Sequence, residues 1–90
     1  MNTRFYNYGD YSSSNYGAHT LAFETKEGTF YFSYETLVAF RSNKTGNLYV
    51  RENVWGNTTG KHLNWIDGGN KKTRLSRKAF EEALALEGVR

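Results

Sequence analysis

Residues 19–34 read HTLAFETKEGTFYFSY, and this stretch decides the fold. Its first half alternates apolar with polar side chains and places Leu21 and Phe23 on one face. Its second half alternates again, so Phe30 and Phe32 can meet the first pair across two antiparallel strands. The glycine of the intervening KEGT sequence can adopt positive φ, as a tight turn requires. The stretch therefore predicts a β-hairpin.

A third strand is expected over Thr36–Ser42, with Val38 and Phe40 on one face. Only Glu35 and Thr36 separate it from the hairpin, and neither residue favours the tight turns of hairpins. A bend or bulge fits this junction as well as a tight turn does.

A fourth strand is expected over Asn47–Val54. A period of two places three side chains inward (Leu48, Val50 and Val54) and three outward (Tyr49, Arg51 and Asn53). The four strands together predict an antiparallel meander with one face in water.

A short helical turn is expected over His62–Ile66, where Thr58 or Thr59 can serve as the N-cap. Leu63 and Ile66 are three residues apart and would both face the sheet.

The last segment predicts an α-helix that begins after Ser76 as the N-cap. Leu75 and Phe80 occupy the two positions of a hydrophobic staple, and Phe80 and Leu84 follow helical spacing into a core. Gly88 is a typical residue to end the helix.

The fold class expected is α+β: a small antiparallel β-meander of three to four strands, a short helical turn and one C-terminal α-helix. Residues 19–90 are expected to form this single domain, whose core is modest because the chain is short. Residues 1–18 are rich in Tyr, Ser, Asn and Gly and predict a flexible arm, or an edge strand near Arg4–Tyr8.

The charge is concentrated in the middle of the chain. Residues 41–78 hold nine Lys or Arg against two acids, a net charge of +7, whereas residues 1–40 and 79–90 each carry −2. A basic segment that also holds both tryptophans is typical of a surface that attracts anions. The candidate anion- or partner-binding residues are Arg51, Lys61, His62, Lys71, Lys72, Arg74, Arg77 and Lys78, and the candidate aromatic contacts are Tyr49 and Trp55.

Some of these residues have two interpretations. Arg77 and Lys78 lie in the first turn of the last helix, where they either recruit an anion or pair with acids four residues later. Trp55 is equally suited to a binding surface and to the core, whereas Trp65 lies beside apolar neighbours and is expected in the core.

Motifs for catalysis or metal binding are weak. Gly56–Lys61 has three residues between its glycines instead of the four of a phosphate-binding P-loop, and His follows the lysine where Ser or Thr is needed. Ser33 or Thr59 can pair with His62 as nucleophile and base, but the sequence places no orienting carboxylate with them. The chain has no cysteine and two widely separated histidines. We therefore expect no enzyme, no cofactor and no metal.

The stretches YFSYETLVAFR (31–41), VRENVW (50–55) and TTGKHLNWI (58–66) resemble a group of small uncharacterised proteins of bacteriophages and plasmids. The resemblance covers about residues 19–80 and implies a mobile-element setting. Short non-enzymatic proteins in that setting often act on host machinery or defence systems, and the resemblance supplies no site residues.

Two functions are therefore expected from the sequence. The first is a small binding protein that contacts nucleic acid or a nucleotide through its basic middle. The alternative is an inhibitor that docks through Tyr and Trp anchors on a host defence complex, such as a CRISPR effector. No apolar run approaches the roughly 20 residues of a membrane span and no signal peptide is evident, so a cytoplasmic protein is expected.

Overall fold

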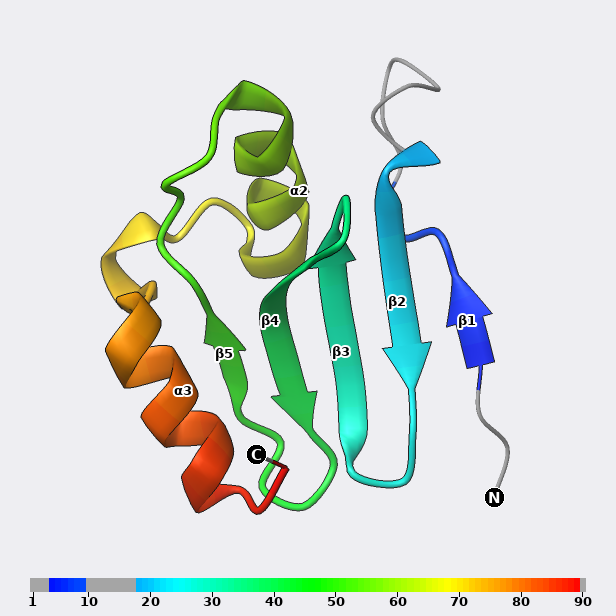
Figure 1. Cartoon of the computed structure of the whole chain (residues 1–90), viewed down its shortest axis with the longest axis vertical. Coiled ribbons are helices and arrows are strands. Elements are labelled where there is room, and N and C mark those ends of the chain that lie inside the picture. The colour runs from blue at the N-terminus through cyan, green and yellow to red at the C-terminus, as the bar shows by residue number, and fades with distance from the viewer. Residues whose placement is uncertain (1–3, 10–17, 90) are drawn as a thin grey trace.

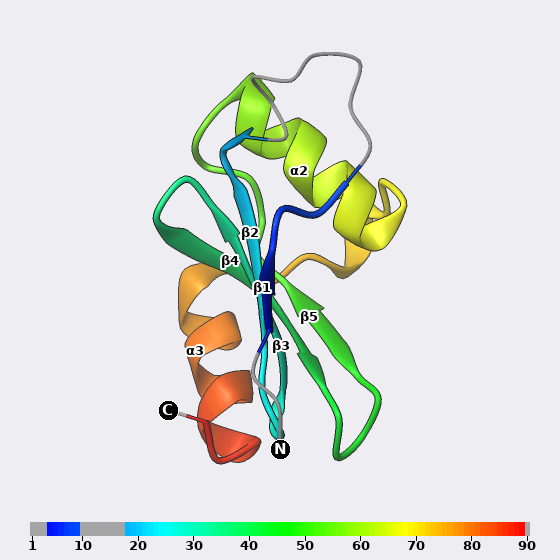
Figure 2. The same cartoon turned by 90° about the vertical axis from the view of Figure 1, so that its right-hand side faces the viewer.

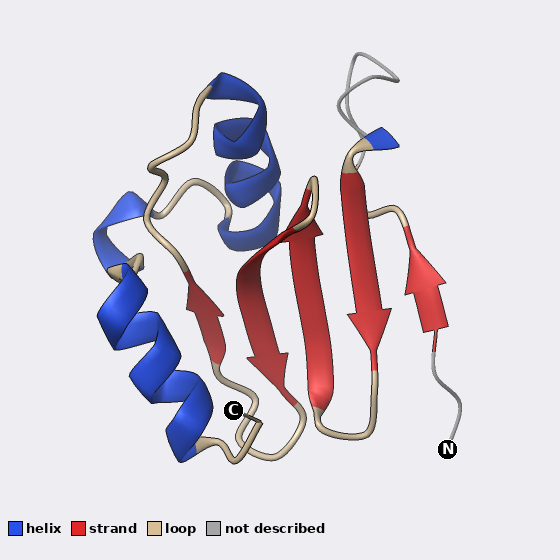
Figure 3. Cartoon of the chain, viewed as in Figure 1, coloured by secondary structure: helices blue, strands red, loops and turns tan. Residues whose placement is uncertain are grey.

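The computed structural model describes residues 4–9 and 18–89. Within them the strands follow one another in the sheet in chain order, and every neighbouring pair is antiparallel (Figure 1). The elements are β1 (Arg4–Tyr6), β2 (Thr20–Glu24), β3 (Gly28–Ser33), β4 (Thr36–Ser42), β5 (Leu48–Val50), α2 (Asn57–Asp67), the 3-10 turn η1 (Lys71–Thr73) and α3 (Arg77–Leu86). The prediction of an α+β meander is confirmed (Figure 3), but the sheet has five strands rather than three or four.

The fifth strand, β1, is the edge strand that was expected near Arg4–Tyr8 as the alternative to a flexible arm. It pairs with β2 so that Phe5 lies opposite Phe23, and their rings stack with centroids 4.4 Å apart. Tyr8 follows β1, is 1% exposed and donates a hydrogen bond of 2.9 Å to the Phe32 carbonyl oxygen. Residues 4–9 therefore belong to the folded domain. Residues 1–3 and 10–17 of the expected arm lie outside the described residues.

Helices cover both faces of the sheet (Figure 2). On one face α2 packs against a buried cluster formed by Tyr8, Ala22, Tyr31, Val38, Ala39, Val50, Leu63 and Ile66. On the other face α3 supplies Phe80 and Leu84, which pack against Phe40. The expectation of one face in water is wrong, because the apolar stripe of α3 is buried on the face opposite α2.

A β-bulge in β4 explains how this strand serves both cores. Tyr31 pairs with Ala39 while the next residue, Phe32, pairs with Leu37, so Val38 is the extra residue. Val38 and Ala39 both enter the α2-side cluster, whereas Phe40 enters the α3-side cluster. The prediction that Val38 and Phe40 share a face is therefore wrong, since the bulge interrupts the alternation.

The β3–β4 hairpin has a tight turn as well as the bulge. Ser33 pairs with Thr36, which leaves Tyr34 and Glu35 as the two turn residues. Tyr34 adopts a φ of 57°, which is uncommon for a residue other than glycine. Both alternatives considered for this junction, a tight hairpin and a bulge, are therefore present.

The second helical segment is longer than expected. The helix α2 has 11 residues, begins after Gly56 and has no side-chain N-cap, so Thr58 and Thr59 lie inside its first turn. Leu63 and Ile66 face the sheet as predicted. Trp65 is 47% exposed, so its expected place in the core is wrong. It lies two residues from Leu63, about 200° around the helix.

The C-terminal helix confirms its predicted boundaries. Ser76 is the N-cap of α3, and its Oγ accepts a hydrogen bond of 3.3 Å from the Ala79 N–H. Leu75 packs against the same cluster as Phe80 and Leu84, as the staple pattern predicts. No helix in the described part of the chain is long and apolar enough to cross a membrane.

The strand β5 ends earlier than expected. After Val50 the chain pairs with the segment before α3: the Leu75 N–H donates to the Val50 carbonyl at 2.7 Å, and the Glu52 N–H donates to Leu75 at 2.8 Å. Val50 is buried as predicted. Val54 is 62% exposed, so its inward placement is wrong, because the chain has left the sheet before it.

Candidate functional site

A cleft of about 610 Å³ lies between α2, η1 and the loop that follows β5. We call it the Asn/Lys cleft, and its lining residues are Glu52, Asn53, Asn57, Gly60, Lys61, Asn64, Lys71 and Arg74. Two of the predicted cations, Lys61 and Lys71, are exposed in it and come from different elements. Three asparagines add amide donors and acceptors between the charges.

Asn53 holds the loop that forms one wall of the cleft. Its side-chain oxygen accepts hydrogen bonds from the N–H groups of Trp55 at 3.0 Å and Gly56 at 3.3 Å, and its amide donates to the Gly56 carbonyl at 3.0 Å. A Cβ at Gly60 would stand 3.0 Å from the Asn53 amide nitrogen. Glycine at this position therefore allows the loop to lie close against α2.

Arg74 lines the cleft but forms an ion pair that stabilises the fold. Its Nε and Nη2 donate to the two carboxylate oxygens of Asp67 at 2.8 and 3.0 Å, and Nη2 also donates to Asn64 at 2.9 Å. The side chains of Arg74 and Asp67 are only 4% and 5% exposed. Arg74 was predicted to contact an anion, but its charge already has a buried, bidentate carboxylate partner, Asp67.

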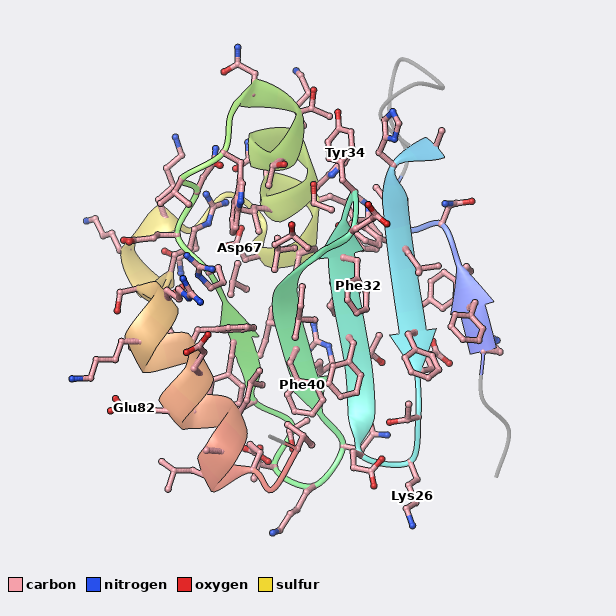
Figure 4. All side chains as sticks on the ribbon, viewed as in Figure 1. Lys26, Phe32, Tyr34, Phe40, Asp67 and Glu82 are labelled. Carbon is pink, nitrogen blue, oxygen red and sulfur yellow. The ribbon has the colours of Figure 1, made fainter. Side chains whose placement is uncertain are left out.

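A second hollow, of about 360 Å³, lies at the start of α2, and we call it the aromatic hollow. Its lining residues are Ser33, Tyr34, Thr36, Trp55, Gly56, Asn57, Thr58 and Thr59. Trp55 is 40% exposed and Tyr34 is 49% exposed, which favours the surface interpretation of Trp55. Figure 4 shows Tyr34 at the end of the sheet beside α2, where its ring stacks on His19 with centroids 4.3 Å apart.

The buried wall of the aromatic hollow is a hydrogen-bond network. The Ser33 hydroxyl lies 2.7 Å from Nδ1 of His62 and 2.8 Å from the hydroxyl of Thr59. His62 is fully buried, so it cannot belong to the exposed basic surface on which the sequence analysis placed it. It lies on the face of α2 that packs on the sheet, where the network joins α2 to the end of β3.

A third hollow, of about 450 Å³, lies between the β5–α2 loop and the first turn of α3. We call it the arginine hollow, and its lining residues are Thr36, Leu37, Arg51, Val54, Trp55, Arg77, Phe80 and Glu81. The Arg51 guanidinium carbon lies 4.9 Å from the centre of the Trp55 ring. Arg51 is half-buried rather than fully outward, because the face expected to be in water carries α3.

The remaining predicted residues lie elsewhere. Tyr49 packs against the α3-side cluster and its hydroxyl donates to Glu87 at 2.7 Å, so it is not a free aromatic contact. Arg77 is exposed and pairs with Glu81 at 3.3 Å, as the i,i+4 interpretation expects. Lys72 and Lys78 are exposed but line none of the three hollows.

The three hollows share lining residues around the loop at the start of α2, and we call them together the band. Asn57 lines both the Asn/Lys cleft and the aromatic hollow, and Trp55 lines both the aromatic hollow and the arginine hollow. Cations therefore stand at both ends of the band, with exposed aromatic rings between them.

A family model described as a family of unknown function, DUF8033, matches residues 3–82. The chain belongs to the DUF8033 family. The matched residues include β1 and the whole band, and they end inside α3. No curated protein and no solved structure matches the chain.

The asparagines and Tyr34 line the hollows but were not predicted as site residues from the sequence. The spacing of four and three residues places Asn57, Lys61 and Asn64 on one face of α2. This polar face could have been predicted only if the helix had been expected to begin at residue 57. Tyr34 carried no such signal, because its exposure depends on its place in the two-residue turn between β3 and β4. Among the described residues no group of three or more His, Cys, Asp or Glu is arranged to hold a metal ion.

Proposed function

We propose that this protein is a non-enzymatic binding protein for single-stranded nucleic acid, which it holds along the band around the start of α2. The observation that carries the proposal is that the hollows of the band share lining residues: exposed Lys61 and Lys71 line the Asn/Lys cleft, and exposed Trp55 and Tyr34 line the aromatic hollow. Phosphates need cations and bases need aromatic faces, and the band offers both.

The chemistry favours a single strand over a duplex. Bases in a duplex are stacked on one another, whereas those of a single strand can stack on exposed rings such as Trp55 and Tyr34. The side-chain amides of Asn57 and Asn64 can both donate and accept, which suits base edges and sugars. The net charge of +7 on residues 41–78 supports attraction of the phosphate backbone.

A charge-matched pair of variants tests the proposal. The double variant Lys61→Gln/Lys71→Gln removes the two exposed cations of the Asn/Lys cleft. The control Lys26→Gln/Lys44→Gln removes two other exposed lysines, which line a separate hollow with Glu27 and Glu87. Binding of a fluorescent single strand is measured by anisotropy. We expect the cleft variant to weaken binding and to reduce the magnitude of the log K against log salt slope by about 1.4, because each phosphate contact contributes about 0.7 for single strands.

Equal effects of the two double variants would show that binding follows net charge alone and would contradict the band as the site. Trp55→Ala is expected to weaken binding more than Trp65→Ala, because Trp65 lies outside the aromatic and arginine hollows. Both tryptophans are about equally exposed, so this pair separates position from exposure.

A second candidate function is docking on a host protein, such as a defence complex in the cytoplasm of a phage- or plasmid-bearing cell. It is favoured by Phe5, which is 63% exposed on the edge strand and stacks on Phe23. Aromatic anchors dominate protein interfaces, whereas surface lysines contribute little. For this function Phe5→Ser would abolish capture of the partner and Lys61→Gln would leave it unchanged.

A further inference from the structure

Among the described residues, Arg51 has no acidic partner. Arg4, Arg74 and Arg77 each lie 2.8 to 3.5 Å from a carboxylate oxygen, whereas no described carboxylate lies within ion-pair distance of Arg51. Its Nε is also buried and has no hydrogen-bond acceptor among the described residues. A guanidinium carries five N–H donors, and removing them from water costs free energy unless an acceptor replaces the water.

The Trp55 ring does not supply that acceptor. It lies under the guanidinium, with the Arg51 carbon 4.9 Å from the ring centre, so it attracts the charge through its face. Arginine N–H groups point outward in the plane of the guanidinium, and their acceptors lie in that plane. The ring therefore holds the guanidinium in place and leaves its donors for another group.

The surroundings of Arg51 fit an oxyanion. Arg77 stands on the other wall of the arginine hollow and adds a second positive charge, partly offset by Glu81 at 3.3 Å. Phe80 and Leu37 provide an apolar floor. A guanidinium binds phosphate or carboxylate oxygens in pairs, and two arginines suit the higher charge of a phosphate better than a single carboxylate.

We propose that the arginine hollow is a phosphate subsite, with Arg51 as the residue that binds the phosphate oxygens and Trp55 as the residue that orients it. This subsite is separate from the Asn/Lys cleft at the other end of the band. It rests on the proposed function only for the source of the phosphate, which would be the backbone of the bound strand.

The test uses NMR of the full chain labelled with ¹⁵N. The buried Nε–H of Arg51 should give a slowly exchanging signal, assigned by its loss in Arg51→Lys. The wild type is titrated with inorganic phosphate, with acetate and with chloride at matched ionic strength. We expect a saturable shift of the Arg51 signal with phosphate, a smaller one with acetate and none with chloride. The buried Nε–H of Arg74, which donates to Asp67 and lies outside the hollow, serves as the internal control.

The Trp55 indole N–H reports on the same site in the variant. Arg51→Lys keeps the charge but loses the planar pair of donors, so we expect phosphate affinity at Trp55 to fall at least tenfold. An Arg51 signal that moves equally in phosphate and chloride would overturn the subsite, as would a larger response to acetate. The wild-type titration decides the question even if Arg51→Lys fails to fold.

A single-stranded oligonucleotide separates this inference from the proposed function. If phosphate shifts Arg51 but the oligonucleotide does not bind, the subsite stands and the proposed function fails. If the oligonucleotide binds without moving the Arg51 signal, the proposed function stands and the subsite fails.

Discussion

The hydroxyl of Ser33 lies 2.7 Å from Nδ1 of His62, and both side chains are buried. Ser33 is the last residue of β3 and immediately precedes Tyr34, while His62 lies in the middle of α2. This contact therefore links the end of β3 to α2, and both elements line the aromatic hollow. The same hydroxyl also contacts Thr59, which lines the hollow itself.

Ser33→Ala should destabilise the fold by about 1–3 kcal/mol, because it removes a buried hydrogen-bond partner from both His62 and Thr59. Urea unfolding followed by circular dichroism measures the free energy of unfolding. Thr36→Val is the control, since it removes an exposed hydroxyl and keeps the side-chain shape. We expect the control to stay within about 0.5 kcal/mol of wild type. Equal stabilities of the two variants would contradict a structural role for the network.

Phe80→Ala should cost about 3–5 kcal/mol, because Phe80 is 3% exposed in the α3-side cluster. A domain of this size has about 5 kcal/mol or somewhat more in total, so the variant should be largely unfolded at room temperature. Leu86→Ala in the same helix is the control, since Leu86 is 88% exposed. A cooperative thermal transition near the wild-type temperature for Phe80→Ala would show that α3 does not contribute to the core.

Asp67→Asn should cost about 3–5 kcal/mol, because it leaves the buried Arg74 charge without its carboxylate. Glu81→Gln breaks the exposed pair with Arg77 and should cost less than about 1 kcal/mol. Chemical denaturation of both variants gives the two values side by side. Similar costs would mean that Arg74 does not depend on Asp67 and is free to bind an anion.

Hydrogen bonds from the hydroxyls of Tyr49 and Ser42 hold the pKa of Glu87 below its ordinary value of 4.5. The charged carboxylate is thus favoured in the folded state. Its contribution to stability is present above pH 4.5 and is lost as the pH falls through the lower, folded pKa.

Tyr49→Phe removes the larger cause and should move the pKa of Glu87 upward. The ¹³C chemical shift of the side-chain carboxyl, followed against pH in both proteins, measures this change. A titration midpoint that is the same in both would show that the Tyr49 contact does not stabilise the carboxylate.

Local patterns predicted the regular elements well. The strands over residues 20–24, 28–33 and 36–42 follow from alternation and turn residues, and α3 follows from its cap and staple. The bulge at Val38 could not be predicted from the sequence, because it depends on tertiary packing: Val38 and Ala39 pack in the α2-side cluster and Phe40 packs in the α3-side cluster. The extra residue shifts the alternation by one, so the side chains beyond Val38 point to the face opposite to the one that strict alternation predicts.

The candidate site was predictable only in part. Lys61 and Lys71 were recognised by charge, and the structure brings them together in one cleft. The burial of Arg74 could not be predicted from the sequence, because its contact with Asp67 depends on how the chain turns between α2 and η1. His62 was misplaced because it was grouped with the cations by residue type, although it lies four residues before Ile66 and therefore on the same, sheet-facing side of the helix.

We propose above all that the band around the start of α2 binds single-stranded nucleic acid. The most direct measurement is the affinity of the wild type for a fluorescent single strand of about 12 nucleotides, at about 50 and about 200 mM salt. With two to four phosphates neutralised by Lys61, Lys71, Arg51 and Arg77, affinity should fall by about 7- to 50-fold between these conditions. A duplex of the same length should bind more weakly at both. No detectable association with the single strand at the lower salt concentration would contradict the account.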